Sequence, residues 1–332
     1  ADRVREALFA GSDHMARAFR RMAIADLPPL DRSALVERRL ISRDLAQDGP
    51  GREVLVSRDE HLSIMVNEED HVRIQAITPG FSVDEAFDLG LRTVRYLEEN
   101  LAFAYHERFG YLTACPTNVG TGLRVSVMVH LPGHVLGGAI EPLVDSLRKL
   151  RFAVRGMYGE HSEAGGALYQ VSNQATLGLS EDEIRTELRR VAASVVERER
   201  TLRRELHRVQ PLALEDRVGR SLGILRNARL LTAEEALQRL SDLRLGVALG
   251  LCPDLDAGTV DDLVNRIGPA SLQKARNRDL PPQERDAVRA EEIRTRLASG
   301  GAAPPMTPTA PTPADPTPPG PGTPPDPGPS AP

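Results

Sequence analysis

Tryptophan is absent from this chain of 332 residues, and aromatic side chains make up only 4% of it. Proteins that bind single-stranded nucleic acid stack bases on exposed aromatic rings, so this composition does not indicate such a surface. A net charge of -5 and an isoelectric point near 6.0 also provide no general basic field. No apolar run reaches the ~20 residues of a membrane-spanning helix. We therefore expect neither a nucleic-acid nor a membrane partner.

Cysteine is also scarce in this chain. Its two cysteines, Cys115 and Cys252, are too few for a disulfide framework, and no signal peptide opens the sequence. Both absences favour a cytoplasmic location under reducing conditions. The sequence begins at Ala1 without methionine, which favours a fragment or a processed form.

Lysine is nearly missing, since Lys149 and Lys274 are the two lysines and 40 of the 42 basic residues are arginines. A GC-rich genome is a sufficient explanation for this bias. It still matters for function, because arginine keeps its charge and binds phosphate through two parallel hydrogen bonds.

Hydrophobic periodicity predicts a mixed N-terminal part and a helical C-terminal part. Capping boxes that start at Ser82, Ser180 and Thr232 each predict the beginning of a helix. Residues 158–166 are rich in glycine and glutamate and predict a mobile loop. The predicted strands are residues 53–56, 62–66, 72–77, 123–131, 152–157 and 167–171, and the predicted helices are residues 1–45 with a break at 27–30, 82–108, 135–150 and 180–209.

Strand signals end before residue 210, which predicts a domain boundary there. Residues 1–210 form the predicted mixed domain, and residues 211–299 form a predicted all-helical domain. The tail at 300–332 holds 14 of the 26 prolines. Because its other residues are mostly small or polar, it cannot bury a core, and we expect disorder with polyproline II character.

Two short segments carry most of the chemistry. Asn67–Arg73 packs carboxylates, a histidine and an arginine into seven residues, and on a strand Glu69 and His71 would share one face. Cys115–Arg124 places a thiol, a glycine-rich turn and an arginine in a row. Each has an ordinary alternative, since charges at a strand end are often a solvated turn and a lone cysteine is often a core residue. An acidic cluster at the junction of buried strands, however, needs partners or a function.

With these segments, the chain resembles the ATP:guanidino phosphotransferases, most closely the bacterial protein arginine kinases of the McsB type. The resemblance runs from about residue 1 to residue 298 and implies an α+β fold, an antiparallel sheet flanked by helices, with an all-α domain after it. Its motifs lie in one order along the chain: Asn67–Arg73, Cys115–Arg124, Arg124–Met128, Arg155–Glu160 and Arg285–Ala290.

The resemblance implies a role for each matching residue. Glu69 would orient the acceptor guanidinium and take its proton, Glu160 would be the second carboxylate, and Cys115 would lie against the guanidinium as a thiolate. Arginines would bind the phosphates of ATP, with Mg²⁺ held through those phosphates. The implied ATP-binding residues are Arg39, Arg73, Arg124, Val125, Ser126, Val127, Met128, Arg155, Gly156, Met157, Tyr158, Gly159 and Glu160.

The segment Arg285–Ala290 has two interpretations. Its pattern alone is typical of a solvated charged helix, with Arg285 and Arg289 on one face. The resemblance instead implies an allosteric phosphoarginine pocket made by Arg285, Asp286, Arg289 and Ala290. Such a pocket would dock marked proteins and activate the enzyme.

The resemblance implies the partners as well. These are protein substrates with exposed arginines, a heat-shock repressor, a Clp unfoldase–protease, a zinc-binding activator protein, and a second copy of the chain in a homodimer or higher oligomer. The implied reaction is ATP-dependent phosphorylation of protein arginine, which marks proteins for degradation during stress.

Two departures from the family pattern keep other functions open. Residues 1–45 contain no Ser-Arg-x-Arg-type segment, which in the family supplies upstream phosphate ligands, and Arg39 stands where the family usually has a nucleotide-contacting histidine. The alternatives are a kinase of small guanidino compounds and a non-catalytic phosphoarginine-binding module.

Overall fold

The computed structural model describes residues 1–9, 17–47, 49–156 and 165–298, which all belong to one contact unit, Ala1–Gly301. Predictions for residues 157–164 and for the proline-rich tail lie outside the described residues. Among the described helices, none combines the length and apolarity needed to cross a membrane.

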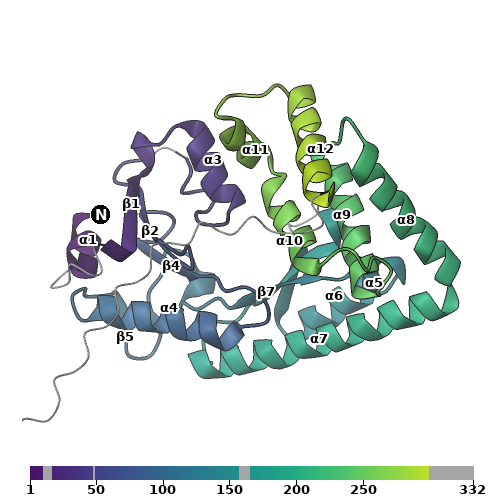
Figure 1. Ribbon diagram of the computed structural model, residues 1–332. Coiled ribbons are helices and arrows are strands. Elements are labelled where there is room, and N and C mark those ends of the chain that lie inside the picture. The colour runs from purple at the N-terminus through teal and green to yellow at the C-terminus, as the bar shows by residue number, and fades with distance from the viewer. Residues whose placement is uncertain (10–16, 48, 157–164, 299–332) are drawn as a thin grey trace, which may run out of the picture. The chain divides into compact units, whose positions relative to one another are not determined.

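The N-terminal part is built on an antiparallel meander with the order β1-β2-β3-β4 (Figure 1). Its central strands β2 and β3 are buried on both faces. Leu55 and Ile64 pair across the strands and pack against helices α1 and α4, whereas Val54 and Met65 pair and pack against α3. The elements are α1 (Asp2–Phe9), β1 (Phe19–Ala23), η1 (Ile24–Asp26), α3 (Pro29–Glu37), β2 (Glu53–Ser57), β3 (Leu62–Val66), β4 (Val72–Ala76) and α4 (Val83–Glu98).

Three local predictions are wrong here. Residues 19–23, expected to be helical, form edge strand β1, because Phe19 gains a buried place beside Leu55 by pairing with β2. Helix α4 ends at Glu98 rather than near residue 108, and the short strands β5 (Tyr105–His106) and β6 (Gly110–Tyr111) follow it. Ser82 makes no capping bond, since its hydroxyl donates to the carbonyl of Pro79.

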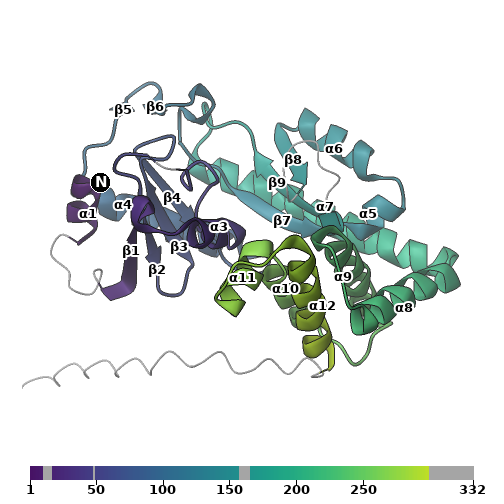
Figure 2. The ribbon, with the colours of Figure 1, turned by 90° about the horizontal axis from the view of Figure 1, so that it is seen from above.

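The second sheet has the order β7-β9-β8, with all pairs antiparallel (Figure 2). Val127 and Val171 on one face pack against Leu188 and Val191 of the long helix α7. The expected helix at 135–150 is two helices, because Gly137 and Gly138 separate them. The elements are η2 (Pro116–Asn118), β7 (Ser126–His130), α5 (Pro132–Leu136), α6 (Ile140–Lys149), β8 (Phe152–Gly156), η3 (Gly165–Ala167), β9 (Leu168–Asn173) and α7 (Glu181–Val209).

A buried carboxylate joins α5 to α7. Glu199 accepts hydrogen bonds from the backbone N–H groups of Gly133 (2.8 Å) and His134 (3.0 Å) and from Arg203 Nε (2.5 Å), and His134 Nδ1 lies 2.7 Å away. Burial alone raises the pKa of Glu199, but these bonds outweigh it and leave the pKa below its usual value of 4.5. The carboxylate is therefore ionised at neutral pH and holds the two helices together.

We expect Glu199→Gln to lower the free energy of unfolding at pH 7 by about 3 kcal/mol, because a glutamine leaves buried donors without an acceptor. A lowered pKa in the fold means that this stabilisation is present above pH about 4.5 and lost as the pH falls below it. Urea titrations at several pH values should therefore show a larger acid loss for the wild type than for the variant. Glu197→Gln, in an exposed pair with Arg200, is the matched control.

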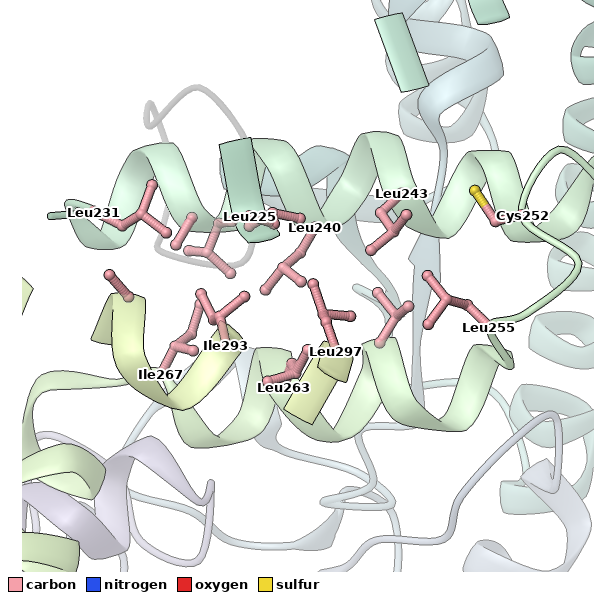
Figure 3. Packing of buried hydrophobic residues seen from close by; sticks show 14 of the residues in the cluster. Leu225, Leu231, Leu240, Leu243, Cys252, Leu255, Leu263, Ile267, Ile293 and Leu297 are labelled. Atoms are coloured by element: carbon pink, nitrogen blue, oxygen red, sulfur yellow. The ribbon is translucent and has the colours of Figure 1, made fainter. Parts of the chain in front are cut away.

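Helices after residue 210 pack around their own apolar core, and no strand occurs between residues 211 and 298. Figure 3 shows leucine and isoleucine side chains converging from these helices, with Cys252 at one end. Ser180 forms the predicted capping box at α7, and Thr232 caps α9 by accepting from Glu235 N. The helices are α8 (Pro211–Asn227), α9 (Ala233–Ala248), α10 (Ala257–Arg266), α11 (Pro269–Arg276) and α12 (Pro282–Ala298).

A single carboxylate from the N-terminal part caps one of these helices. Glu37, the last residue of α3, accepts from the backbone N–H groups of Ala270 (2.7 Å) and Ser271 (2.8 Å) and from the Ser271 hydroxyl (2.8 Å). These donors are at the start of α11, where a negative charge is favoured. A Cβ at Gly268 would collide with the same carboxylate.

We expect Glu37→Ala to lower the free energy of unfolding by about 1–3 kcal/mol, since it leaves helix-terminal donors without an acceptor. Lys274→Ala breaks a more exposed pair between the same helices, Lys274–Asp31 at 2.7 Å, and should cost less than about 1 kcal/mol. Urea denaturation of both variants tests the difference. Equal losses would show that Glu37 acts only as a surface charge.

Candidate active site

The two segments singled out in the sequence meet in the structure. Residues 67–71 form the turn between β3 and β4, and Asp70 Oδ1 accepts a hydrogen bond from Ala114 N at 2.6 Å. The expectation that Glu69 and His71 share a strand face is wrong, because Asn67 takes a left-handed φ of 57° and its N–H donates to the carbonyl of His71. Asparagine tolerates this conformation better than most residues.

Glu68 organises the acidic turn, although sequence reasoning gave it no role. Its side chain is only 3% exposed, and its Oε1 lies 3.0 Å from Arg73 Nη1. Burial raises the pKa of Glu68, but hydrogen bonds from Ser42 and the Glu69 N–H, together with the charge of Arg73, bring it below the usual value. The ionised Glu68 thus holds Arg73 in place. The position of Glu68 within the acidic segment Asn67–Arg73 is the one sequence feature that could have indicated this role.

Arg124 lies at the centre of the predicted residues. Burial lowers the pKa of Arg124, and the charges of Arg155 and Arg73 lower it further, while Cys115 and Glu69 act in the opposite direction. Two further predicted phosphate ligands, the predicted base and the predicted thiol therefore each lie within electrostatic range of Arg124. Arg124 Nη2 also donates to Asn118 Oδ1 at 3.1 Å, a contact that sequence reasoning missed.

The loop that carries Cys115 is fixed at several points. Cys115 Sγ lies 3.0 Å from Thr117 Oγ1, and the Thr113 hydroxyl donates to the Cys115 carbonyl at 2.7 Å. Gly120 adopts a φ of 115° and approaches the Thr176 carbonyl so closely that a Cβ would clash there. The half-buried thiol is therefore held in place by backbone geometry as well as by its neighbours.

Asn173 connects this loop to the second sheet. Its Oδ1 accepts from Val125 N at 2.7 Å, and its Nδ2 donates to the Leu123 carbonyl at 3.0 Å. Asn173 is buried, so the amide fixes the path of the chain on both sides of Arg124. No sequence motif pointed to this residue.

The predicted ATP-binding residues of β7 and β8 lie on two different faces of the second sheet. Met128 and Arg155 both lie opposite Gln170, and Gln170 Nε2 donates to Ser126 Oγ at 2.9 Å, so these side chains share the face away from α7. Val125 and Val127 pack into the core instead. They can reach a nucleotide only through the backbone. Gly156 ends β8, and Met157, Tyr158, Gly159 and Glu160 lie outside the described residues.

Arg39 follows α3 in a left-handed conformation with a φ of 60°. Its carbonyl accepts a hydrogen bond from Gln75 Nε2 of β4. Arg39 lines a cavity together with Met128. The structure therefore brings these two residues, both predicted to bind ATP, to one place.

The C-terminal motif has an interior arginine. Arg289 is 2% exposed, and it donates through Nε to the Ile267 carbonyl (3.0 Å) and through Nη1 to the Leu231 carbonyl (2.8 Å) and Asp286 Oδ1 (2.5 Å). Arg285, by contrast, is partly exposed. Arg289 thus ties α12 to the end of α10, and Arg285 is the arginine of the pair that remains accessible.

Comparison with known proteins agrees with this geometry. The profile of the ATP:guanido phosphotransferase C-terminal catalytic domain matches residues 1–202, and that of the protein-arginine kinase McsB C-terminal domain matches residues 211–307. Protein-arginine kinase from Caldanaerobacter subterraneus subsp. tengcongensis is 45% identical over 88% of this chain and 87% of its own. The enzyme of that name from Symbiobacterium thermophilum is 48% identical over 83% and 78%.

Solved structures show the same catalytic fold. Lombricine kinase superposes with a TM-score of 0.53 at 27% identity, over 60% of this chain and 58% of that one. The duplicated taurocyamine kinase from Schistosoma mansoni superposes with a TM-score of 0.55 at 24% identity, over 66% of this chain and 32% of that one, and shows likeness of fold alone. Fold and site define a guanidino phosphotransferase. The chain belongs to the ATP:guanido phosphotransferase family and, within it, to the protein-arginine kinases.

Proposed function

We propose that this protein transfers the γ-phosphoryl group of ATP to arginine side chains of proteins. One observation carries the proposal: Glu69, Cys115 and the arginines 73, 124 and 155 gather where the β3–β4 turn meets the loop before β7. This group combines a base, a thiol and cations in a chain whose relatives are protein-arginine kinases.

In the proposed reaction the substrate is Mg·ATP, with the metal bound through the phosphates. Arg73, Arg124 and Arg155 bind the phosphate oxygens and neutralise charge in the transition state. A guanidinium nitrogen attacks the γ-phosphorus, the bond to the ADP oxygen breaks, and the departing proton passes to a carboxylate.

Glu69 is the proposed acceptor of that proton. Because a guanidinium has a pKa above ~12, free base is scarce and the proton must leave as the nitrogen–phosphorus bond forms. Alignment of the two substrates supplies on the order of 7–11 kcal/mol of the barrier. Cys115 is proposed to contact the acceptor guanidinium as a thiolate, and Glu160 to supply the second carboxylate.

The remaining expectations belong to the same proposal. Residues 1–210 form the catalytic domain, and residues 211–299 form a domain that binds phosphoarginine through Arg285 and Asp286, with Arg289 positioning Asp286. Ala290, which the resemblance also implied for this pocket, is excluded from it, because it is fully buried in the core of the helical part. The proposed partners are a heat-shock repressor, a Clp unfoldase–protease, a zinc-binding activator and a second copy of the chain, all in the cytoplasm, where ATP is supplied.

The test is to incubate the chain with Mg·ATP and an arginine-rich protein and to measure acid-labile phosphate on arginine. Transfer to free arginine but not to protein would replace the proposal with a small-molecule guanidino kinase. Absence of any transfer, with phosphoarginine binding intact, would replace it with a binding module.

A further inference from the structure

A cavity of about 160 Å³ lies where β7 meets helices α9 and α10. Met128, His130 and Arg39 line it from the mixed region, residues 1–210, and Leu240, Ser241 and Val264 line it from the helical region, residues 211–298. A cavity of about 150 Å³ is large enough to bind a benzene-sized ring. The space between the two regions is therefore of a size that suits a flat aromatic group.

Apolar side chains reach this cavity from both regions. Met128 and Leu168 come from adjacent strands of the sheet, and Leu240 and Val264 come from α9 and α10. Met128 is 41% exposed although it is a large apolar residue. Binding sites for flat ligands typically combine such apolar contacts with a few polar groups that fix orientation.

The polar groups also come from both regions. His130 Nε2 lies 2.8 Å from Ser241 Oγ, whereas its buried Nδ1 has no hydrogen-bond partner among the described residues. Burial and the charges of Arg203 and Arg244 lower the pKa of His130 to about 3, so the ring is neutral. The neutral ring therefore forms part of the cavity wall and joins β7 to α9 through Ser241.

Helix α10 adds further polar groups. Asn265 lines the cavity and is exposed, and its amide offers one donor and one acceptor group. Arg244 Nε donates to Asp261 Oδ1 at 2.9 Å at the same cavity and joins α9 to α10. The donor and acceptor atoms can bind the polar edge of a purine, and the apolar walls can pack against its two faces.

The position of the cavity relative to Arg124 suits a nucleotide. Met128 is four residues after Arg124 along an extended chain, a span of about 13 Å at 3.3 Å per residue. This is on the order of the length of an extended nucleoside triphosphate. A nucleotide whose phosphates contact Arg124 can therefore reach the cavity with its base.

We infer that α9 and α10 complete the nucleotide site by forming one wall of the pocket for the purine base. This inference rests on the proposed function, because it takes the phosphates to bind at Arg73, Arg124 and Arg155. It makes the helical region part of the nucleotide site. By linkage, nucleotide binding then strengthens the contact between α9–α10 and β7 as much as that contact strengthens nucleotide binding.

The test is calorimetric binding of Mg·ADP and of Mg·triphosphate, which lacks a base, to the full chain. Val264→Phe fills the cavity and should raise the Kd for ADP by about tenfold or more, while the Kd for triphosphate stays unchanged. Asn265→Ala, at an exposed position, should raise the Kd for ADP by about threefold to tenfold. Leu212→Phe, at the 77% exposed Leu212 of α8, is the control and should change neither value.

A higher Kd for ADP in either folded variant, with the Kd for triphosphate unchanged, supports the inference. A Kd for ADP equal to that of the wild type in Asn265→Ala and in any folded Val264→Phe overturns it. Arginine phosphorylation by the wild-type chain is measured in parallel. If the wild type phosphorylates protein arginine and the variants bind ADP normally, the inference fails alone, whereas absence of transfer by the wild type rejects the proposed function.

Discussion

Replacing Glu69 with glutamine is expected to lower the rate of arginine phosphorylation by about 10²–10⁴-fold. Glutamine keeps the size of the side chain but cannot accept the proton that the acceptor guanidinium must lose. Glu69 is exposed at the β3–β4 turn and acts electrostatically on Arg124, so its side chain is accessible and lies near the phosphate ligands. The measurement is the kcat for phosphate transfer to an arginine-rich protein.

ADP binding separates this effect from a general loss of structure. Because Glu69 is proposed to act on the acceptor and not on the nucleotide, Glu69→Gln should bind ADP within about twofold of the wild type. Glu85→Gln, at an exposed position of α4, is the matched control and should transfer normally. Retention of more than a tenth of the wild-type kcat by Glu69→Gln would show that another group takes the proton.

Arg124→Ala is expected to lower kcat by about 10²–10³-fold, since it removes a donor aimed at the developing charge. It should also raise the Kd for ADP and for triphosphate together, because its contacts are to phosphate and not to the base. Its guanidinium is held by Asn118 and already lies close to Arg73 and Arg155. The repulsion among these arginine charges is relieved when the negatively charged phosphates of a nucleotide bind between them.

The measurement is steady-state kinetics with Mg·ATP together with calorimetric binding. Arg124→Lys keeps the charge but loses the paired donors, so it should recover only part of the activity. Arg148→Ala, in an exposed pair with Asp145 on α6, is the matched control and should behave like the wild type. An unchanged kcat in Arg124→Ala would remove this residue from the proposed phosphate site.

Two of the five motifs that carry the family resemblance are held together by contacts within themselves. Asn67–Arg73 and Cys115–Arg124 contain within themselves the contacts Glu68–Arg73, Cys115–Thr117 and Arg124–Asn118. Such contacts between near neighbours in the chain follow from the residues present. Asp70 then joins the motifs by its bond to Ala114, which no local pattern could predict.

Two of the local predictions that were wrong have a common physical reason. Residues 19–23 form a strand because β2 offers a partner, and Ser82 turns to Pro79 rather than to its own helix. Arg289 has the pattern of a solvated helix residue, yet the carbonyls of Ile267 and Leu231 hold it inside. For residues 19–23 and for Arg289, a contact from a distant part of the chain outweighed a weak local preference, whereas Ser82 is engaged by a carbonyl only three residues before it.

By itself, the sequence determined the guanidino phosphotransferase family, the change from mixed to helical structure after residue 210 and the capping box at Ser180. Each of these depends on residue types at short spacings, where backbone preference and hydrophobic period decide. Only the tertiary structure decided that Glu37 caps α11 across 233 positions, that His130 meets Ser241 across 111, and that a cavity lies beside that contact. Such pairs are fixed when separate elements pack their apolar faces together, and no pattern within either element records the partner.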